Sequence, residues 1–137
     1  MTIEQNLAIA REVQERMWNQ RDMSVFQEYY APDHINHGPH GKFLPPGPDS
    51  LRTIVTTMIA ALPDVHGTIE KQEAEGDLVK TWVTFRGTQT GKLLNIPPTG
   101  RKSVILVMFT DRIVNGKIVE SWSDWDPEEL LRQLGLG

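Results

Sequence analysis

Two carboxylates near the C-terminus, Asp124 and Asp126, are the residues of this chain best suited to acid–base chemistry. They alternate with tryptophans in the segment 121–126. Large apolar rings beside a carboxylate disfavour its charged form and move its pKa toward the range that a general base needs. Asp126 also has a structural interpretation, because Pro127 and two glutamates follow it, as they often follow a helix N-cap. We expect Asp126 to cap a helix and keep both carboxylates as catalytic candidates, with Asp124 as the candidate base.

His37 is the histidine with the best prospect of a chemical role, as a donor to a developing oxyanion. It begins a loop rich in glycine and proline, so it could equally be a neutral histidine that fixes this loop by donating to a backbone carbonyl. His34, His37 and His40 are three residues apart, with Pro39 between the last two. This is not the spacing of a helical ligand pair, and we therefore expect no metal site.

Aromatic residues spread along the chain could form the walls of a pocket for a small apolar or aromatic molecule. Aromatic side chains in a domain of this size are also common in an ordinary core, and the sequence leaves both readings open. The candidates for substrate binding are Trp18, Tyr30, Trp82, Phe109 and Trp122.

The composition excludes several classes of function. The chain has 137 residues, enough for one domain spanning residues 1–137. Its formal net charge of −4 comes without any basic stripe, so we expect no nucleic-acid or membrane partner. There is no cysteine to form a disulfide or act as a nucleophile, and no nucleotide-binding glycine motif. No signal peptide is recognisable, and a cytoplasmic location is the default expectation.

Hydrophobic periodicity places helices before strands along the chain. A period near 3.6 predicts helices over 3–20, 22–30 and 49–62, and a short helix over 127–134. Alternating or continuous apolar runs predict strands over 65–74, 78–90 and 103–114, with a short one at 34–37 and a last one after the Asn115-Gly116 turn. This order predicts an α+β domain: a curved antiparallel sheet capped by N-terminal helices around a central pocket.

Taken together, these segments resemble the SnoaL-like polyketide cyclases of the NTF2-like superfamily. The resemblance rests on residues 29–37, 62–64, 87–91, 97–101, 112–122 and 132–135. It implies a cone-shaped α+β barrel, usually a homodimer, with a pocket that holds no cofactor. It also implies that His37 faces this pocket. Relatives of this fold include isomerases, hydrolases and binding proteins without catalysis, so the fold leaves the function open.

Cyclases of this family close a ring by intramolecular aldol condensation. In the best-known members an aspartate near the end of the last strand is the base, and a histidine lies on the strand before it. By the resemblance, Phe109 falls near the histidine and Ser123 falls at the aspartate, with Asp124 one residue later. A shift of one residue moves a side chain to the other face of a strand. We keep Ser123 as a substrate-binding candidate.

Three functions are consistent with this pattern. The first is a cofactor-independent acid–base enzyme (cyclase, isomerase, lyase or hydratase) in which Asp124 is the base and His37 its partner. The second is a protein that binds a small hydrophobic molecule without turnover, and the third is a dimerising scaffold with a filled pocket. We also expect a homodimer formed through the outer face of the sheet, because the apolar run Val104–Phe109 predicts a strand that is covered on both faces.

Overall fold

A curved five-stranded sheet forms the body of the computed structural model, which describes residues 2–39 and 44–136. The sheet is antiparallel except for its first strand, which runs parallel to the last, and the strand order is β1-β5-β4-β3-β2. The strands are β1 (Tyr30–His37), β2 (His66–Glu75), β3 (Leu78–Thr88), β4 (Lys102–Val114) and β5 (Lys117–Asp124). The expected α+β architecture is therefore confirmed, with a sheet that curves without closing, since β1 and β2 are its two edges.

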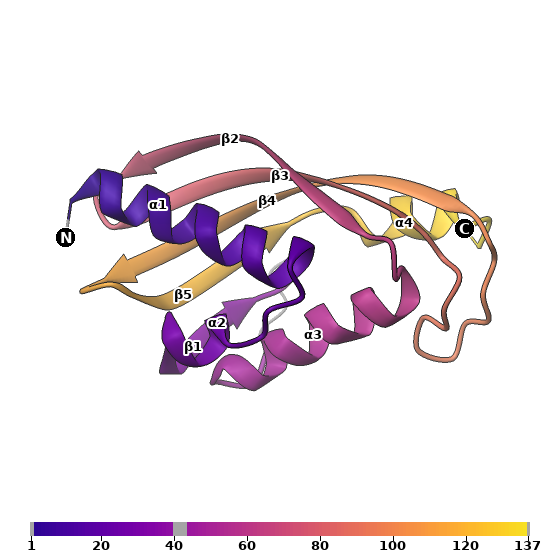
Figure 1. Ribbon diagram of the computed structural model, residues 1–137, viewed down its shortest axis with the longest axis horizontal. Coiled ribbons are helices and arrows are strands. Elements are labelled where there is room, and N and C mark those ends of the chain that lie inside the picture. The colour runs from indigo at the N-terminus through magenta and orange to yellow at the C-terminus, as the bar shows by residue number, and fades with distance from the viewer. Residues whose placement is uncertain (1, 40–43, 137) are drawn as a thin grey trace.

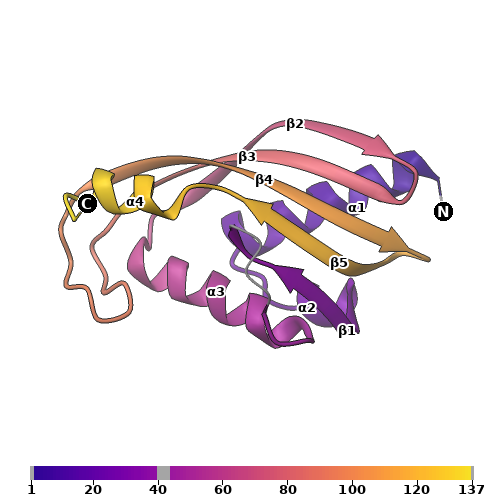
Figure 2. The same cartoon turned by 180° about the vertical axis from the view of Figure 1, so that it is seen from behind.

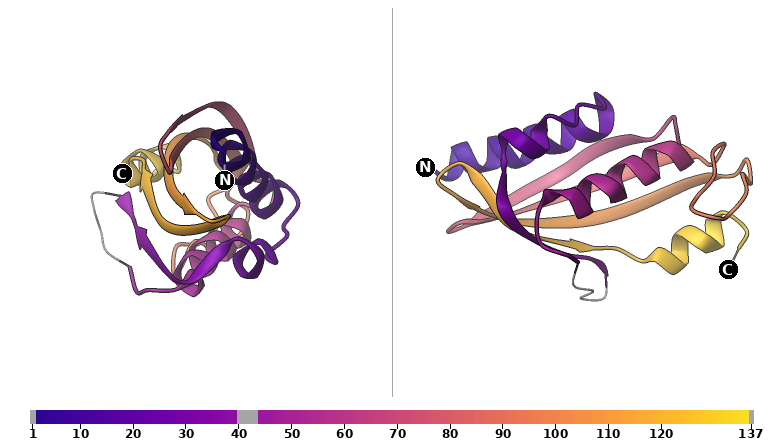
Figure 3. Two further views of the ribbon diagram at one scale, coloured as in Figure 1. Left: turned by 90° about the vertical axis from the view of Figure 1, so that its left-hand side faces the viewer. Right: turned by 90° about the horizontal axis from the view of Figure 1, so that it is seen from below.

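Three helices cover the concave side of this sheet: α1 (Ile3–Gln14), which continues into a π-helical turn, η1 (Glu15–Asn19), α2 (Val25–Glu28) and α3 (Pro48–Ala61). The fourth helix, α4 (Pro127–Gln133), follows β5 at one end of the sheet and lies beside β4. In Figure 1 the strands arch over α1, α2 and α3, and Figure 2 shows the same layers from behind. The end-on view in Figure 3 shows the sheet curling partly around the helices. No helix of the described residues is long and apolar enough to cross a membrane.

The first helix is shorter than the sequence predicts, because it widens into η1. The backbone N–H of Gln20 donates to the carbonyl of Glu15 at 3.2 Å, five residues back, which is the π-helical bond. The side-chain amide of Asn19 holds this turn to β2 through two bonds, accepting from Gly67 N at 2.8 Å and donating to Gly67 O at 2.9 Å. Apolar spacing alone does not predict such a turn, since it depends on this contact with a distant residue.

Strand β4 buries only one of its two apolar faces within the chain. Ser103, Ile105 and Val107 face the core, whereas Val104 and Leu106 are 49% and 55% exposed on the convex side. A strand whose residues are continuously apolar was expected to be covered on both sides. A single chain therefore leaves an apolar strip on the outside of the sheet.

Candidate active site

A cavity of about 610 Å³ lies between the helices and the concave face of the sheet. Most of its wall is apolar, and of the aromatic candidates Trp18, Tyr30, Phe109 and Trp122 line it. Burial, with a smaller contribution from the charge of Asp111, keeps the pKa of Tyr30 well above its usual range, so its phenol stays protonated. The polar lining residues are Gln14, Asn36, Ser103, Asp111, Ser121 and Ser123.

Asp111 on β4 is the only carboxylate among the described residues that line the cavity. It is 2% exposed and lies directly opposite Ser121 of β5. The Ser121 hydroxyl donates to Oδ1 at 2.6 Å, while Oδ2 has no hydrogen-bond partner on the described residues. Burial raises the pKa of Asp111 to about 6, partly opposed by the bond from Ser121. Such a carboxylate can accept and return a proton near neutral pH.

His34 on β1 extends this contact into a chain of three side chains. Its Nε2 lies 2.9 Å from the Ser121 Oγ, and the residue is fully buried. Burial lowers the pKa of His34 to about 4, so the ring is neutral. Because Ser121 has one proton and gives it to Asp111, its oxygen must accept from His34 Nε2–H. The hydrogen bonds therefore run in one direction: His34 donates to Ser121, and Ser121 donates to Asp111.

A β-bulge decides which residues of β5 face the cavity. Ile113 pairs with Ile118 near the turn, and both are buried, but Asp111 pairs with Ser121 rather than with Glu120, which would be its partner in strict register. The extra residue between these pairs reverses the alternation of the strand. Without the bulge Asp124 would face inward, whereas with it Ser121 and Ser123 do.

Asp124 and Trp82 therefore lie outside the cavity, which corrects the expectation that they form its base and one of its walls. Asp124 is exposed at the end of β5. Trp82 belongs to the convex side of the sheet, where Lys71 Nζ lies 4.2 Å from the centroid of its ring. It borders a shallow surface hollow together with Leu106.

Phe109 and Ser123 face each other across β4 and β5, and both line the cavity. These are the positions that the resemblance matches to the family histidine and aspartate. Neither side chain titrates near neutral pH. Asp111 and Ser121 form the next pair on the same face, two residues along each strand.

His37 also lies away from the cavity lining, in a cluster beside its edge. Its ring stacks on Trp122 with centroids 5.1 Å apart and planes 8° apart. Its Nε2 lies 2.7 Å from Oε2 of Glu120, and the other oxygen of this carboxylate, Oε1, lies 3.7 Å from Arg112 Nε. These contacts favour the reading of His37 as a residue that fixes the loop after β1, here through a carboxylate.

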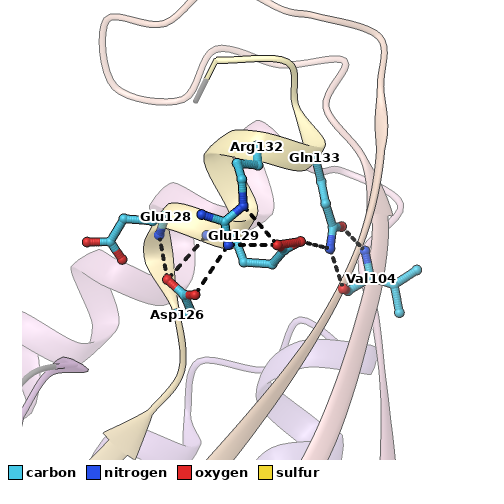
Figure 4. A network of polar contacts seen from close by, with 6 residues as sticks. All are labelled: Val104, Asp126, Glu128, Glu129, Arg132 and Gln133. Atoms are coloured by element: carbon cyan, nitrogen blue, oxygen red, sulfur yellow. Dashed lines mark hydrogen bonds and ion pairs between the residues drawn. The ribbon is translucent and has the colours of Figure 1, made fainter.

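Asp126 caps α4, as expected from the residues that follow it. Its Oδ1 accepts from the backbone N–H groups of Glu128 at 3.0 Å and Glu129 at 3.3 Å (Figure 4). Hydrogen bonding, chiefly with Glu128, lowers the pKa of Asp126, so it stays ionised. The side-chain amide of Gln133 ties the same helix to Val104 of β4 through bonds of 2.7 and 3.0 Å (Figure 4). Asp126 is exposed and does not line the cavity.

Replacing the cap tests this assignment. Asp126→Ala should lower the melting temperature of the protein slightly, because two backbone donors lose their acceptor, while Asp126→Asn should leave it nearly unchanged. Neither variant should reduce turnover. Thermal unfolding of both variants checks the first expectation, and loss of activity in Asp126→Asn with unchanged stability would return Asp126 to the catalytic candidates.

Within residues 2–39 and 44–136, no group of three or more His, Asp or Glu side chains is placed to hold a metal ion. The histidine triplet considered above includes His40, which lies outside the described residues.

The sequence signal that identifies Asp111 is a single acidic residue in a mostly apolar strand. A buried position there demands a partner; Ser121 supplies it from the neighbouring strand β5, and His34 on β1, the strand beyond, bonds to Ser121. Sequence reasoning missed all three roles, because the register of β5 and the parallel pairing of β1 are not visible in the order of residues.

A curved sheet with a helical cover and a mostly apolar cavity between them is the architecture of the NTF2-like fold. The chain matches the SnoaL-like polyketide cyclase family over residues 8–134, and it belongs to that family. It is 33% identical over 115 residues to nogalonic acid methyl ester cyclase of Streptomyces nogalater, covering 79% of this chain and 81% of that protein. Family and relative together identify a cyclase-type enzyme acting on a small molecule.

Solved structures show the same fold. IdmH of Streptomyces antibioticus, a candidate polyketide cyclase, superposes with a TM-score of 0.83 at 29% identity over 96% of this chain and 99% of its own. AclR of Streptomyces galilaeus, a candidate hydroxylase, superposes with a TM-score of 0.87 at 24% identity over 99% of this chain and 88% of its own. The second similarity concerns the fold alone.

Proposed function

We propose that this protein closes a carbocyclic ring by an intramolecular aldol addition, with Asp111 rather than Asp124 as the base. The observation that carries the proposal is a buried carboxylate with one unpartnered oxygen in an apolar cavity. A pKa of about 6 suits Asp111 to remove the acidic proton of a carbon between two carbonyls. An apolar wall also excludes the water that would otherwise protonate the resulting enolate.

Atoms and charges balance without any further reagent. Asp111 Oδ2 takes the proton from carbon, and the enolate carbon attacks a second carbonyl of the same molecule to form the new C–C bond. The alkoxide that results takes the proton back from Asp111, so the product is an isomer of the substrate. Ser121 and His34 act as positioning residues, since their chain holds Oδ1 and leaves Oδ2 for the reacting carbon.

The substrate class follows from the cavity and from the related cyclase. A volume of about 610 Å³ accommodates a molecule of several fused rings, and the few polar groups suit its ketone and hydroxyl oxygens. We propose that turnover needs neither cofactor nor metal, because base catalysis on an acidic C–H requires only the carboxylate.

The experiment uses nogalonic acid methyl ester as the first probe, in the presence of a chelator and with no added cofactor. We expect a product of unchanged mass with a new retention time in liquid chromatography, and deuterium uptake at the acidic carbon in D₂O. Activity restored only by a metal or a redox cofactor would contradict the proposal. So would a rate of deuterium exchange at the acidic carbon that is the same with and without the protein.

A second function, binding without turnover, is favoured by one observation: Phe109 and Ser123 occupy the positions that align with the catalytic histidine and aspartate of the family. The same experiment separates the two. Saturable binding of the ester with no isomer and no deuterium exchange would establish a binding protein.

We also propose that two copies associate through the convex face of the sheet. The exposed strip around Val104 and Leu106 supports this, because apolar strand residues at 49% and 55% exposure favour a partner. Sedimentation at micromolar concentration should give a dimer, and Leu106→Glu should shift it toward monomer. Leu136→Glu, at an exposed apolar residue beyond the sheet, is the matched control. A wild-type monomer would refute the proposal.

A further inference from the structure

Two buried polar atoms on the helical side of the cavity have no partner on the described residues: Gln14 Oε1 and Trp18 Nε1. Both residues line the cavity, with exposures of 5% and 8%. Neither belongs to the chain of His34, Ser121 and Asp111, which lies on the sheet. A buried polar group without a partner is costly, so each such group calls for an explanation.

The backbone places these two groups together and holds them firmly. Gln14 is the last residue of α1 and Trp18 lies in η1, four residues later, where one helical turn brings side chains to the same side. The bonds from Asn19 to Gly67 fix η1 on β2. The indole packs edge-on against Phe85, with ring centroids 4.8 Å apart. Single π-helical turns occur frequently at functional sites.

We propose that Gln14 and Trp18 form a recognition subsite for the oxygen substituents of an aromatic substrate. The indole N–H donates to a carbonyl oxygen, and the amide of Gln14 pairs with a hydroxyl group of the same molecule. The substrate class is therefore a hydroxylated polycyclic ketone, held on the helical side of the cavity while Asp111 acts from the sheet. This inference rests on the proposed function only in treating the cavity as a substrate site.

The indole can act only as a donor, whereas a primary amide offers both a donor and an acceptor. An apolar cavity binds any flat hydrocarbon by burial alone, without regard to its substituents. Selectivity must then come from the few polar groups, because a ligand that fails to satisfy them leaves them buried and unpaired. The subsite therefore predicts a graded preference among ligands that differ only in oxygen content.

Four rigid probes of one shape test this: fluorene, 9-fluorenone, 2-hydroxy-9-fluorenone and 3-hydroxy-9-fluorenone. Dissociation constants are measured by calorimetry. In the wild-type protein we expect the carbonyl to strengthen binding by roughly fivefold over fluorene, as for one neutral hydrogen bond, and one hydroxy isomer to strengthen it by a similar factor again. Equal affinities for all probes, or no binding of any of them, would overturn the inference.

Variants assign each step to its residue. Trp18→Phe should abolish the gain in affinity that the carbonyl group gives (the carbonyl step), and Gln14→Met should abolish the gain that the hydroxyl group gives (the hydroxyl step). Each variant should bind fluorene with an affinity within about twofold of the wild-type value, which also reports that the cavity is intact. Trp82→Phe, the same substitution on the convex face, should keep both steps. Retention of the carbonyl step in Trp18→Phe would refute the assignment, and the wild-type series remains a test if a variant does not fold.

Binding separates this inference from the proposed chemistry. Asp111→Asn should keep both steps while losing turnover. If the wild-type protein shows the graded preference but no ring closure or exchange, the subsite stands and the proposed function fails. If it turns over an ester and ignores the oxygens of the probes, the function stands and the subsite fails.

Discussion

Replacing Asp111 by Asn is expected to lower turnover by roughly 10²–10⁴-fold, the loss typical of a missing general base. The same substitution is expected to raise the melting temperature of the protein at pH 8. At that pH the wild-type protein keeps a buried carboxylate ionised although its pKa is about 6, against an ordinary value of 3.8. The difference between these two pKa values corresponds to a loss of stability of roughly 3 kcal/mol, at about 1.36 kcal/mol per pKa unit. Asn keeps the shape and still accepts from Ser121, so most of this cost should disappear.

A matched control is available in Asp124→Asn. Asp124 lies on the exposed end of β5 and should be replaceable with little effect on stability or turnover. Steady-state kinetics and thermal unfolding of both variants form one experiment. If Asp124→Asn abolishes turnover while Asp111→Asn retains it, the base is Asp124 and the assignment made from the cavity is refuted.

An aspartate that lowers stability while serving catalysis fits a general pattern. Active sites hold groups that the fold alone would not select, and replacing them often stabilises the protein. Asp111 has this character because its partners satisfy only one of its two oxygens. A purely structural aspartate at this position would be expected to have both oxygens bonded.

The sequence predicts most helices and strands well because they depend mainly on residues that are close together in the sequence. The helix over 49–62 and the hairpin at Asn115-Gly116 follow from apolar period and turn residues, and both occur in the structure. Strand β1 is the exception: Tyr30 belongs to it rather than to the preceding helix. The Ile118 N–H bonds to the carbonyl of Tyr29 at 2.7 Å, so contact with β5, distant in the chain, ends the helix.

The site was harder to predict because it depends on one residue of register. Counting from the turn in strict alternation gives Asp124 an inward position, which is the expectation that the sequence supports. The bulge after Ile118 changes that count and turns Ser121 inward, opposite Asp111. No residue pattern in this stretch predicts a bulge, because the free energy of forming it depends on how β1 and β4 pack on either side of β5.

The pH dependence of stability offers a test that needs no substrate. Between pH 4 and 6, the native pair of Asp111 and His34 holds about one proton, on Asp111, because their pKa values are about 6 and about 4. The unfolded pair also holds about one, on the histidine, since the ordinary values are 3.8 and 6.5. Stability changes with pH only where the two states bind different numbers of protons. The pair should therefore contribute almost no slope to the wild-type protein.

Single replacements should expose two opposite slopes. In Asp111→Asn only His34 remains, and the unfolded state binds a proton that the native state refuses, so stability should fall as pH drops from about 6.5 to about 4. In His34→Gln only Asp111 remains, and the native state binds the extra proton, so stability should fall as pH rises from about 4 to about 6. Each change should reach roughly 3 kcal/mol relative to wild type across its window. Urea unfolding of the three proteins at several pH values measures these differences, in which the titrations of all other groups cancel. If the curves of unfolding free energy against pH for both variants run parallel to the wild-type curve, the pair does not share a proton in this way. The assignment of Asp111 as a base with a pKa near neutral pH would then lose its support.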